Sequence, residues 1–301
     1  MKPNFVIIGA QKSASTFLHH CLREHPDIWL PEGETPAFES PNFEAGEAKQ
    51  LYKKIGDRQE AIIGIKRPSY LCRSEVPQRL YDELNTPKIL LILRHPLDRT
   101  RSAYFHYVSG GFAPLKDLDA GMSELLEGKM QQTWKRSGEI LDFSLYAHGL
   151  RRYLDIFPRS SLFITTHDRV KSQPLETIQE ILAFLGVNQE FVPENLNSRP
   201  QAVNYSLKRL RLRILKNYFL YDYNQDRTRL YAKPSVSPVG KLVCKTIDII
   251  DNRILSKFWH SKSMPQFSHS VEQKLWELFL PDIQETERLT SLDLSVWYDK
   301  P

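Results

Sequence analysis

The stretch FVIIGAQKSASTFLHHCL, residues 5–22, constrains the fold of this chain more than any other segment. Residues 5–8 form a short apolar run, which is typical of a parallel strand covered on both faces. Gly9 ends the run with a backbone that tolerates unusual dihedral angles, and a helix-compatible segment follows after a short loop. The succession predicts a buried strand, a tight loop and a helix.

The loop and the first helical turn carry groups that bind anions. Lys12 lies in the loop, and Ser13, Ser15 and Thr16 fall where the unpaired N–H groups and the dipole of a helix start attract negative charge. This pattern predicts a phosphate or sulfate cradle, although an ordinary capped helix after a core strand would look similar. It is not the P-loop of nucleoside triphosphatases, GxxxxGK followed by Ser or Thr, because only two residues separate Gly9 from Lys12.

A second strand-to-helix joint lies at residues 88–107, KILLILRHPLDRTRSAYFHY. A fully apolar run leads directly to Arg94, and Pro96 suits the first turn of a helix. An arginine at the carboxyl end of a strand points into the crevice where open α/β sheets bind ligands, and Ser102 follows about two helical turns later. We predict that the two side chains share one phosphate; a surface arginine and a solvated serine are the alternative.

With both elements in view, the chain resembles the sulfotransferases that use 3′-phosphoadenosine 5′-phosphosulfate, PAPS. Residues 12–16, KSAST, resemble the 5′-phosphosulfate loop of that family, and residues 94–104, RHPLDRTRSAY, are similar to its 3′-phosphate motif, RxPxxRxxSxY. The resemblance implies that PAPS is the sulfuryl donor and that adenosine 3′,5′-bisphosphate, PAP, is the product. The residues it implies for binding this cosubstrate are Lys12, Ser13, Ala14, Ser15, Thr16, Arg94 and Ser102.

Two further segments fit the same resemblance. Residues 64–71, GIKRPSYL, resemble the strand-end KxPSY segment of the heparan sulfate and related bacterial sulfotransferases, in which the lysine, here Lys66, faces the reaction centre. Residues 275–297 resemble their closing helix. The resemblance implies a catalytic role for Lys12, which would hold the leaving phosphate and bridging oxygen, and for Lys66, which would approach the transferring sulfuryl group.

The catalytic base is harder to assign. In the related enzymes a KExHF segment supplies a glutamate, whereas this chain reads LPEGETPAFES at residues 30–40. If Phe38 is kept aligned, Thr35 falls on the glutamate position. A one-residue shift in this loop, which contains prolines and a glycine, returns Glu34 to the site, and Glu34 is therefore the predicted base. The alternatives are Glu39, Glu32, His19, His20, His106 and water.

Position 14 departs from the family loop, which often has glycine there. An alanine at positive φ is strained because its Cβ approaches the backbone. The presence of Ala14 therefore predicts a loop that does not need positive φ at this position.

The order of apolar runs and helical patterns predicts an α/β fold with a central parallel sheet flanked by helices. The predicted strands are residues 5–9, 62–66, 88–93 and 162–165. The predicted helices are residues 15–24, 76–84, 96–107, 145–157, 174–185 and 271–289. We expect one sulfotransferase domain over residues 1–301, built around the P-loop-like phosphosulfate-binding loop.

Two segments are expected to lie outside this alternation. Residues 110–142 form a long insertion rich in Lys, Glu and Gly, which is typical of a loop that lids an active site. Residues 205–262 contain a basic helical segment with an apolar stripe. The stripe consists of Leu207, Leu210, Ile214 and Leu215. A solvated basic face is the first interpretation; cations that close over the nucleotide, and a membrane-surface or nucleic-acid role, are the others.

Composition narrows the class of protein. The net charge of +5, from 41 basic and 36 acidic residues, suits a polyanionic cosubstrate and is too small to indicate nucleic acid. The three cysteines stand far apart without CxxC spacing, so we expect inert thiols, no disulfide framework and no metal site. Residue 5 already begins a strand and no apolar span is long enough for a bilayer, so we expect a cytoplasmic protein without stable membrane insertion.

The sequence thus predicts a PAPS-dependent sulfotransferase that modifies a hydroxyl or amino group of a small-molecule acceptor. The acidic residues of the loop at 30–40 favour a cationic acceptor, such as a guanidinium toxin among natural products. A glycan sulfotransferase and a catalytically silent PAP- or PAPS-binding protein are the alternatives, while a P-loop kinase is disfavoured by the missing GxxxxGK loop. Specificity belongs to loops and not to the PAPS motifs, so the acceptor stays open, as does the oligomeric state.

Overall fold

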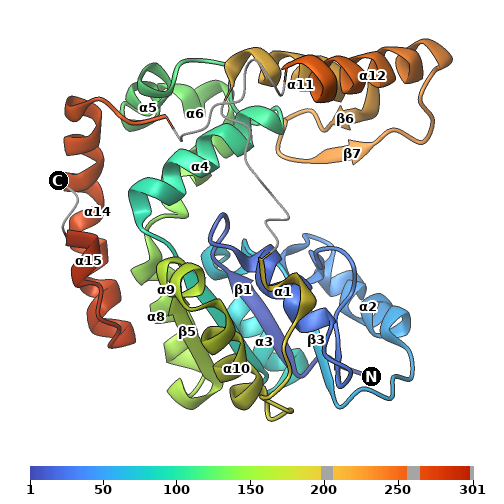
Figure 1. Ribbon diagram of the computed structural model, residues 1–301, viewed down its shortest axis with the longest axis vertical. Helices are drawn as coiled ribbons and strands as arrows, with labels where there is room; N and C mark the ends of the chain where they lie inside the picture. The colour runs from blue at the N-terminus through green and yellow to red at the C-terminus, as the bar shows by residue number, and fades with distance from the viewer. Residues whose placement is uncertain (198–205, 256–264, 299–301) are drawn as a thin grey trace. The chain divides into compact units, whose positions relative to one another are not determined.

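The computed structural model describes residues 1–197, 206–255 and 265–298 (Figure 1). The chain forms two compact units. The first unit contains Met1–Pro96, Leu145–Gln201 and Phe279–Lys300, and the second contains Leu97–Ser144 and Ala202–Leu278.

The first unit is built on a five-stranded parallel sheet in the order β2, β3, β1, β4, β5 (Figure 1). The strands are β1 (Phe5–Gly9), β2 (Ile28–Trp29), β3 (Ile62–Lys66), β4 (Lys88–Leu93) and β5 (Leu162–Thr166). The predicted parallel sheet is confirmed; β2 was missed because two residues are too few to form an apolar pattern. Since β1 lies between β3 and β4, the residues that follow these three strands meet at one edge of the sheet.

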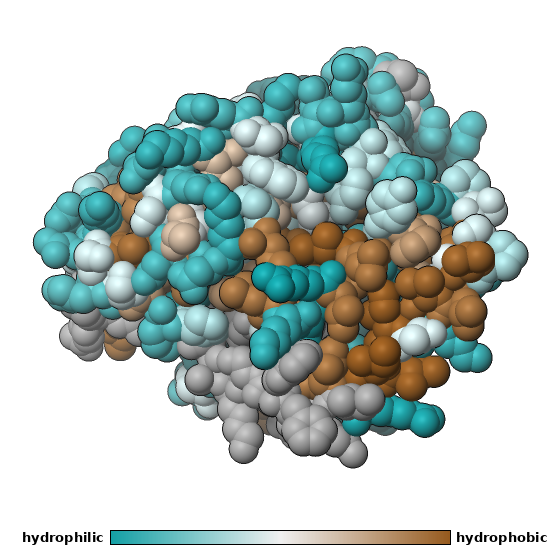
Figure 2. All heavy atoms as spheres, turned by 90° about the horizontal axis from the view of Figure 1, so that it is seen from above, coloured by the Kyte–Doolittle hydropathy of each residue, from teal (hydrophilic) through white to brown (hydrophobic). Residues whose placement is uncertain are grey.

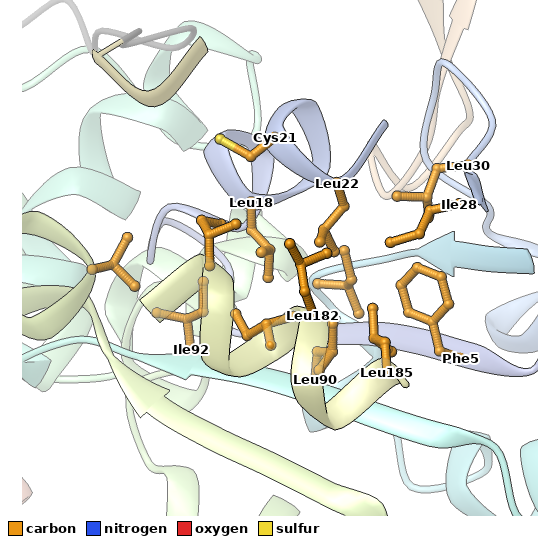
Figure 3. Close-up of a cluster of buried hydrophobic side chains, with 14 residues drawn as sticks. Phe5, Leu18, Cys21, Leu22, Ile28, Leu30, Leu90, Ile92, Leu182 and Leu185 are labelled. Atoms are coloured by element: carbon orange, nitrogen blue, oxygen red, sulfur yellow. The ribbon is translucent and has the colours of Figure 1, made fainter. Parts of the chain in front are cut away.

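Helices α1 (Ser15–Arg23) and α10 (Pro174–Leu185) cover one face of this sheet (Figure 3). Leu18 and Leu22 from α1 and Leu182 from α10 pack there against apolar side chains of β1 and β4. The strand alternation sends Phe5 and Ile7 to this face and Val6, between them, to the other. The remaining helices of the unit are α2 (Glu47–Ile55), α3 (Val76–Leu84), α8 (Tyr146–Ile156), α9 (His167–Ser172) and α15 (Ser295–Tyr298).

Local signals set several helix ends. Pro174 opens α10, and Gly186, at φ 82°, closes it with N–H bonds to two carbonyls of the last turn, so the predicted bounds of this helix are confirmed. The first turn of α8 is capped from a distant segment, because the Asp282 carboxylate accepts hydrogen bonds from the N–H groups of Tyr146 and Ala147, at 2.7 and 3.0 Å. Asp282 belongs to α14 (His269–Thr290), which begins in the second unit and continues in the first.

In its described residues, the second unit consists of helices and one two-stranded antiparallel sheet. Its elements are α4 (Pro96–Ser109), α5 (Leu118–Leu126), α6 (Lys129–Thr133), α7 (Glu139–Asp142), α11 (Leu207–Leu220), β6 (Tyr221–Tyr223), β7 (Leu230–Ala232) and α12 (Pro238–Ile250). The expectation of a loop at residues 110–142 is wrong, because α5, α6 and α7 lie there; these helices are too short for a clear period. A lid role for the segment stays a prediction.

The basic segment at residues 205–262 forms α11, the β6–β7 hairpin and α12, except that residue 205 and residues 256–262 lie outside the described residues. Leu210 is fully buried, as the predicted apolar stripe requires, but Leu215 is exposed. The stripe was therefore only partly correct. Ion pairs join the two helices, from Arg209 to Asp251 at 2.6 Å and from Lys216 to Asp248 at 2.6 Å. No helix within the described ranges is both long and apolar enough to cross a membrane.

Candidate active site

The loop after β1 has the backbone of an anion-binding loop. Lys12 and Ala14 lie in the left-handed region, at φ 69° and 70°. Left-handed residues in such loops turn successive N–H groups toward one concave side, which attracts anions. The prediction that position 14 does not need positive φ is wrong: the tight turn before α1 imposes this conformation on an alanine, at a cost of about 1–2 kcal/mol.

The hydroxyl groups of this loop fit a bound phosphate or sulfate. Ser13 is fully buried, and its Oγ makes no hydrogen bond within the described part of the chain. An unpaired buried hydroxyl costs about 1–3 kcal/mol, and a bound anion would offset this cost. Ser15 and Thr16 lie in the first turn of α1, and the N-cap residue of this helix, Ala14, makes no side-chain cap to the first N–H groups.

Lys66, the last residue of β3, lies at the same edge of the sheet. Its Nζ donates a hydrogen bond to Thr16 Oγ1 at 3.0 Å and stands 3.8 Å from Glu34 Oε1. The side chain is only 5% exposed. Burial lowers the pKa of the Lys66 ammonium, and the Glu34 carboxylate opposes that effect. The structure therefore brings together three of the residues singled out from the sequence.

Of the three candidate carboxylates in the loop at 30–40, Glu34 is the one beside Lys66. Its side chain is 40% exposed, and its other oxygen, Oε2, accepts a hydrogen bond from Arg67 at 2.7 Å. Glu39 is 10% exposed, and its two oxygens accept from Arg67 and, at 2.6 Å, from Ser69. Glu32 is 91% exposed. Glu39 is thus held by several partners, and Glu32 extends into solvent.

The irregular loop is fixed to the sheet, which explains how Glu34 reaches the site. The Thr35 N–H donates to the carbonyl of Lys66 at 2.9 Å. The buried Tyr70 hydroxyl donates to the Thr35 carbonyl and accepts from the N–H of Phe38 at 3.2 Å. These contacts, made by residues that directly follow Glu34, fix the loop to the end of β3 and hold Glu34 beside Lys66.

The histidines proposed as alternative bases have other environments. His19 is buried, and burial together with the Lys66 charge lowers its pKa to about 4. Its Nε2 lies 2.7 Å from the carbonyl of Pro31, so a neutral ring donates to the start of the acidic loop. His20 is half-buried with its ring edge-on to that of His19, and His106 is exposed on α4 in the second unit.

Arg94 follows β4 in the first unit. Its NH1 donates to the carbonyl of Lys12 at 2.9 Å, and its own carbonyl accepts from the hydroxyl of Tyr146 at 2.7 Å. Its Nε makes no hydrogen bond to another described residue. Ser102 is buried on α4, in the second unit, so the idea of a solvated serine is wrong. A phosphate shared by Arg94 and Ser102 stays a prediction.

Arg67 was missed in the sequence, although it follows Lys66 directly. It contacts both Glu34 and Glu39 and so neutralises the acidic loop. Two sequence features could have indicated its role. Two adjacent cations stand at the end of a predicted strand, and a separate loop contains three glutamates with which they could pair. Long-range pairs of this kind leave no periodic pattern, so the sequence alone did not connect them.

The three cysteines form no disulfide. Cys21 is buried, and burial raises the pKa of its thiol to about 12, as expected for an inert thiol. Among the residues that the structure describes, no group of three or more His, Cys, Asp or Glu side chains has a geometry that could hold a metal ion.

Curated sulfotransferases are similar to this chain in sequence. The chain is 26% identical over 195 residues to heparan sulfate glucosamine 3-O-sulfotransferase 5 of Mus musculus, covering 64% of this chain and 56% of that protein. It is 28% identical over 191 residues to heparan sulfate glucosamine 3-O-sulfotransferase 6 of Homo sapiens, covering 62% and 53%. The chain spans about half the length of these curated relatives.

A solved structure shares the fold. The sulfotransferase from Alicyclobacillus acidocaldarius aligns over 99% of both chains with a TM-score of 0.68 and 23% identity. The family described as the sulfotransferase domain matches residues 2–218, which is most of the chain. This chain therefore belongs to the sulfotransferase domain family.

Proposed function

We propose that this protein is a PAPS-dependent sulfotransferase that modifies a hydroxyl or amino group. The observation that carries the proposal is the position of Lys66. Its Nζ donates a hydrogen bond to Thr16 Oγ1, beside the anion-binding loop, and stands 3.8 Å from Glu34 Oε1. A cation between an anion cradle and a carboxylate is the arrangement that sulfuryl transfer needs, since negative charge grows on the leaving oxygen while the acceptor loses a proton.

The loop residues would bind and orient the donor. PAPS, when bound, supplies the sulfuryl group on the bridging oxygen of its 5′-phosphate. Lys12, the N–H groups of residues 14–16 and the hydroxyls of Ser13, Ser15 and Thr16 would hold that phosphate and stabilise the charge on the leaving oxygen. Arg94 and Ser102 would hold the 3′-phosphate, and the unpaired Nε of Arg94 is a donor suited to it.

Glu34 would take the acceptor's proton. Its Oε2 is bound by Arg67, which leaves Oε1, the oxygen nearer Lys66, as the proton-accepting atom. Arg67 is a positioning residue here, because Glu39 holds its guanidinium from the other side. A catalytically silent binding protein is less well supported, since a chain that had lost its chemistry would have no need to fix a carboxylate beside Lys66.

The ion pairs also bear on the acceptor. The expectation of a cationic acceptor, such as a guanidinium toxin, rested on the acidic loop, but Glu34 and Glu39 are both paired with Arg67. A neutral or anionic acceptor with a free hydroxyl therefore suits the site better. A glucosamine-containing glycan is one such acceptor, and the names of the curated relatives point the same way. Cytoplasmic location stays a prediction.

The test combines binding with turnover. Calorimetry should show that PAP binds, and labelled PAPS should transfer its sulfuryl group to at least one member of a panel containing heparan oligosaccharides, phenols, simple alcohols and guanidinium compounds. Arg94→Ala should weaken PAP binding by about 1.5–3 kcal/mol, the value of a hydrogen bond to a charged group. Arg23→Ala, at an exposed arginine whose contact is Glu32 at 3.8 Å, is the matched control.

Three results would count against the proposal in different ways. Absence of PAP binding would remove the donor assignment. Binding without transfer to any acceptor would favour the silent protein. Transfer to guanidinium compounds alone would restore the cationic acceptor and exclude the glycan.

A further inference from the structure

The second unit exposes an apolar surface that the proposed chemistry does not use. We call it the α11–α12 face and define it by Leu215, Tyr218, Val239, Leu242 and Ile249. Tyr218 is 71% exposed, and Val239 and Leu242 are each 67% exposed. Figure 2 shows hydrophobic side chains gathered into a continuous area on the side where α11 and α12 lie, with single hydrophilic side chains in and around it. Contiguous patches of this kind mark interaction sites.

The helical register gives α12 two apolar faces. Gly240, Cys244 and Ile247 are buried, as expected for the side that packs on the unit. Val239, Leu242 and Ile249 are spaced three and then seven residues apart, which places them along a second stripe that faces solvent. One apolar stripe is enough to hold a helix on a protein surface, so the second is available for another partner.

The end of α11 adds to this stripe. A Cβ on Gly240 would lie 3.1 Å from the ring of Phe219, so the start of α12 lies directly beside the end of α11. Tyr218 and Leu215, one turn earlier, are both exposed on that end of α11. The exposed side chains of the two antiparallel helices therefore form one surface.

Positive charge surrounds the α11–α12 face. Lys241 and Lys245 flank the stripe of α12, and Arg211 precedes Leu215 by one helical turn on the same side of α11. These three cations are exposed and form no ion pair with another described residue. The nearby acids are occupied, because Asp248 and Asp251 pair with cations of α11. An apolar stripe flanked by basic side chains without ion pairs is complementary to a partner surface that has an apolar interior covered by an anionic outer layer.

We propose that the α11–α12 face docks on an anionic phospholipid bilayer, lying in the plane of the interface. The apolar side chains would enter the boundary between headgroups and acyl chains, and the lysines and arginine would contact the phosphates. A second copy of this chain fits less well, because a two-fold contact through the same patch would set the basic rim against itself. This inference is independent of the sulfotransferase proposal.

The test is binding of the full chain to vesicles, measured by flotation. We expect binding to vesicles of phosphatidylcholine mixed with phosphatidylglycerol in equal amounts, weaker binding at high salt, and little binding to phosphatidylcholine alone. Lys241→Glu with Lys245→Glu should lower the affinity by about 25-fold or more, since each lysine near an anionic surface contributes about fivefold. Val239→Ser with Leu242→Ser should lower it by about tenfold for each side chain.

Matched controls lie in the first unit. Lys53→Glu with Lys54→Glu makes the same charge change on exposed lysines of α2, and Val192→Ser with Val296→Ser removes two exposed valines. All variants should keep the circular dichroism spectrum and PAP affinity of the parent chain. Equal losses in the control and test variants would overturn the proposal, because net charge or general hydrophobicity would then account for binding. So would absence of binding to anionic vesicles, or a dimer that Val239→Ser with Leu242→Ser dissociates.

Discussion

The Nζ of Lys66 and the Oγ1 of Thr16 lie 3.0 Å apart, although the two residues are 50 positions apart in the chain. Lys66 ends β3, and Thr16 lies in the first turn of the helix that follows β1, the neighbouring strand. The parallel pairing of the two strands brings both residues to the same edge of the sheet. This single contact joins the anion-binding loop to the residue expected to approach the transferred group.

Lys66→Met should lower the rate of catalysis and raise the stability of the fold. Loss of the cation should lower kcat by about 10²–10³, the range for removal of one preorganised donor to a developing negative charge. The variant should nevertheless have a higher melting temperature at neutral pH, because burial lowers the pKa of Lys66 below its usual value of 10.5 and so penalises the charged form in the folded state. This destabilisation of the folded state is complete at pH values below the pKa of Lys66 in the folded protein. It disappears as the pH rises toward the pKa of Lys66 in the unfolded chain.

The stabilisation in Lys66→Met should therefore shrink at alkaline pH. Thermal unfolding between neutral and alkaline pH measures it, with Lys54→Met on the exposed side of α2 as the control. A melting temperature below that of the parent at neutral pH would show that the bonds of Lys66 to Thr16 and Glu34 outweigh its desolvation.

Lys12→Ala should act on turnover more than on binding. An ammonium that contacts the leaving oxygen gains most in the transition state, so kcat at saturating PAPS should fall by about 10²–10³ while PAP affinity changes much less. Single-turnover kinetics with labelled PAPS measures the first effect and calorimetry the second. Near-normal turnover would make this lysine a structural part of the loop, and Lys53→Ala provides the control for loss of an exposed lysine.

Substitutions of the three glutamates in the loop at 30–40 should differ in their effects on kcat and on stability. Glu34→Gln keeps the shape of the side chain and should lower kcat by about 10²–10⁴ with PAP affinity preserved. Glu39→Gln should mainly lower stability, because Glu39 holds Arg67 and Ser69 together. Glu32→Gln, at a side chain that is 91% exposed, should change neither property. If Glu39→Gln abolishes turnover while Glu34→Gln does not, the base is Glu39.

Ala14→Gly should stabilise the protein. Glycine adopts the observed φ of 70° without a Cβ clash, and the relief should be worth about 1 kcal/mol in the free energy of unfolding. Denaturant titration measures the change. The reference is Ala48→Gly in α2, a buried helical position where the same substitution should destabilise by about 1 kcal/mol or more. A loss of stability in Ala14→Gly would mean that the alanine's packing matters more than its backbone strain.

His19→Gln should flatten the pH dependence of stability in weak acid. Burial, with the nearby Lys66 charge, lowers the pKa of His19 from 6.5 to about 4, so between these values the unfolded chain binds a proton that the folded chain does not. Stability therefore falls as pH drops through this window, by up to about 1.4 kcal/mol per pH unit. Glutamine can still donate to the carbonyl of Pro31 and does not titrate.

Urea unfolding at intervals from pH 7 to pH 4 compares the slopes, with His148→Gln, at an exposed histidine of α8, as the control. An unchanged slope in His19→Gln would assign the acid sensitivity to other groups.

Short-range patterns in the chain were sufficient for four of the five strands of the sheet and for the anion-binding loop. The apolar runs at residues 5–9 and 88–93 became β1 and β4 with the expected bounds, and the loop at Lys12 lies where a strand meets a helix. Such features depend on neighbouring residues, so a linear pattern contains them. The same holds for the motifs by which the chain resembled its family.

Other features depended on contacts between distant segments. Glu34 and Glu39 are equivalent by residue type, and both pair with Arg67. The contact of Glu34 with Lys66 and that of Glu39 with Ser69 distinguish them. The strained φ of Ala14 follows from a turn fixed by the surrounding sheet, and Leu215 is exposed although its spacing predicted burial. Burial, ion pairing and backbone strain are set by what surrounds a residue in space, and a linear pattern does not specify those surroundings.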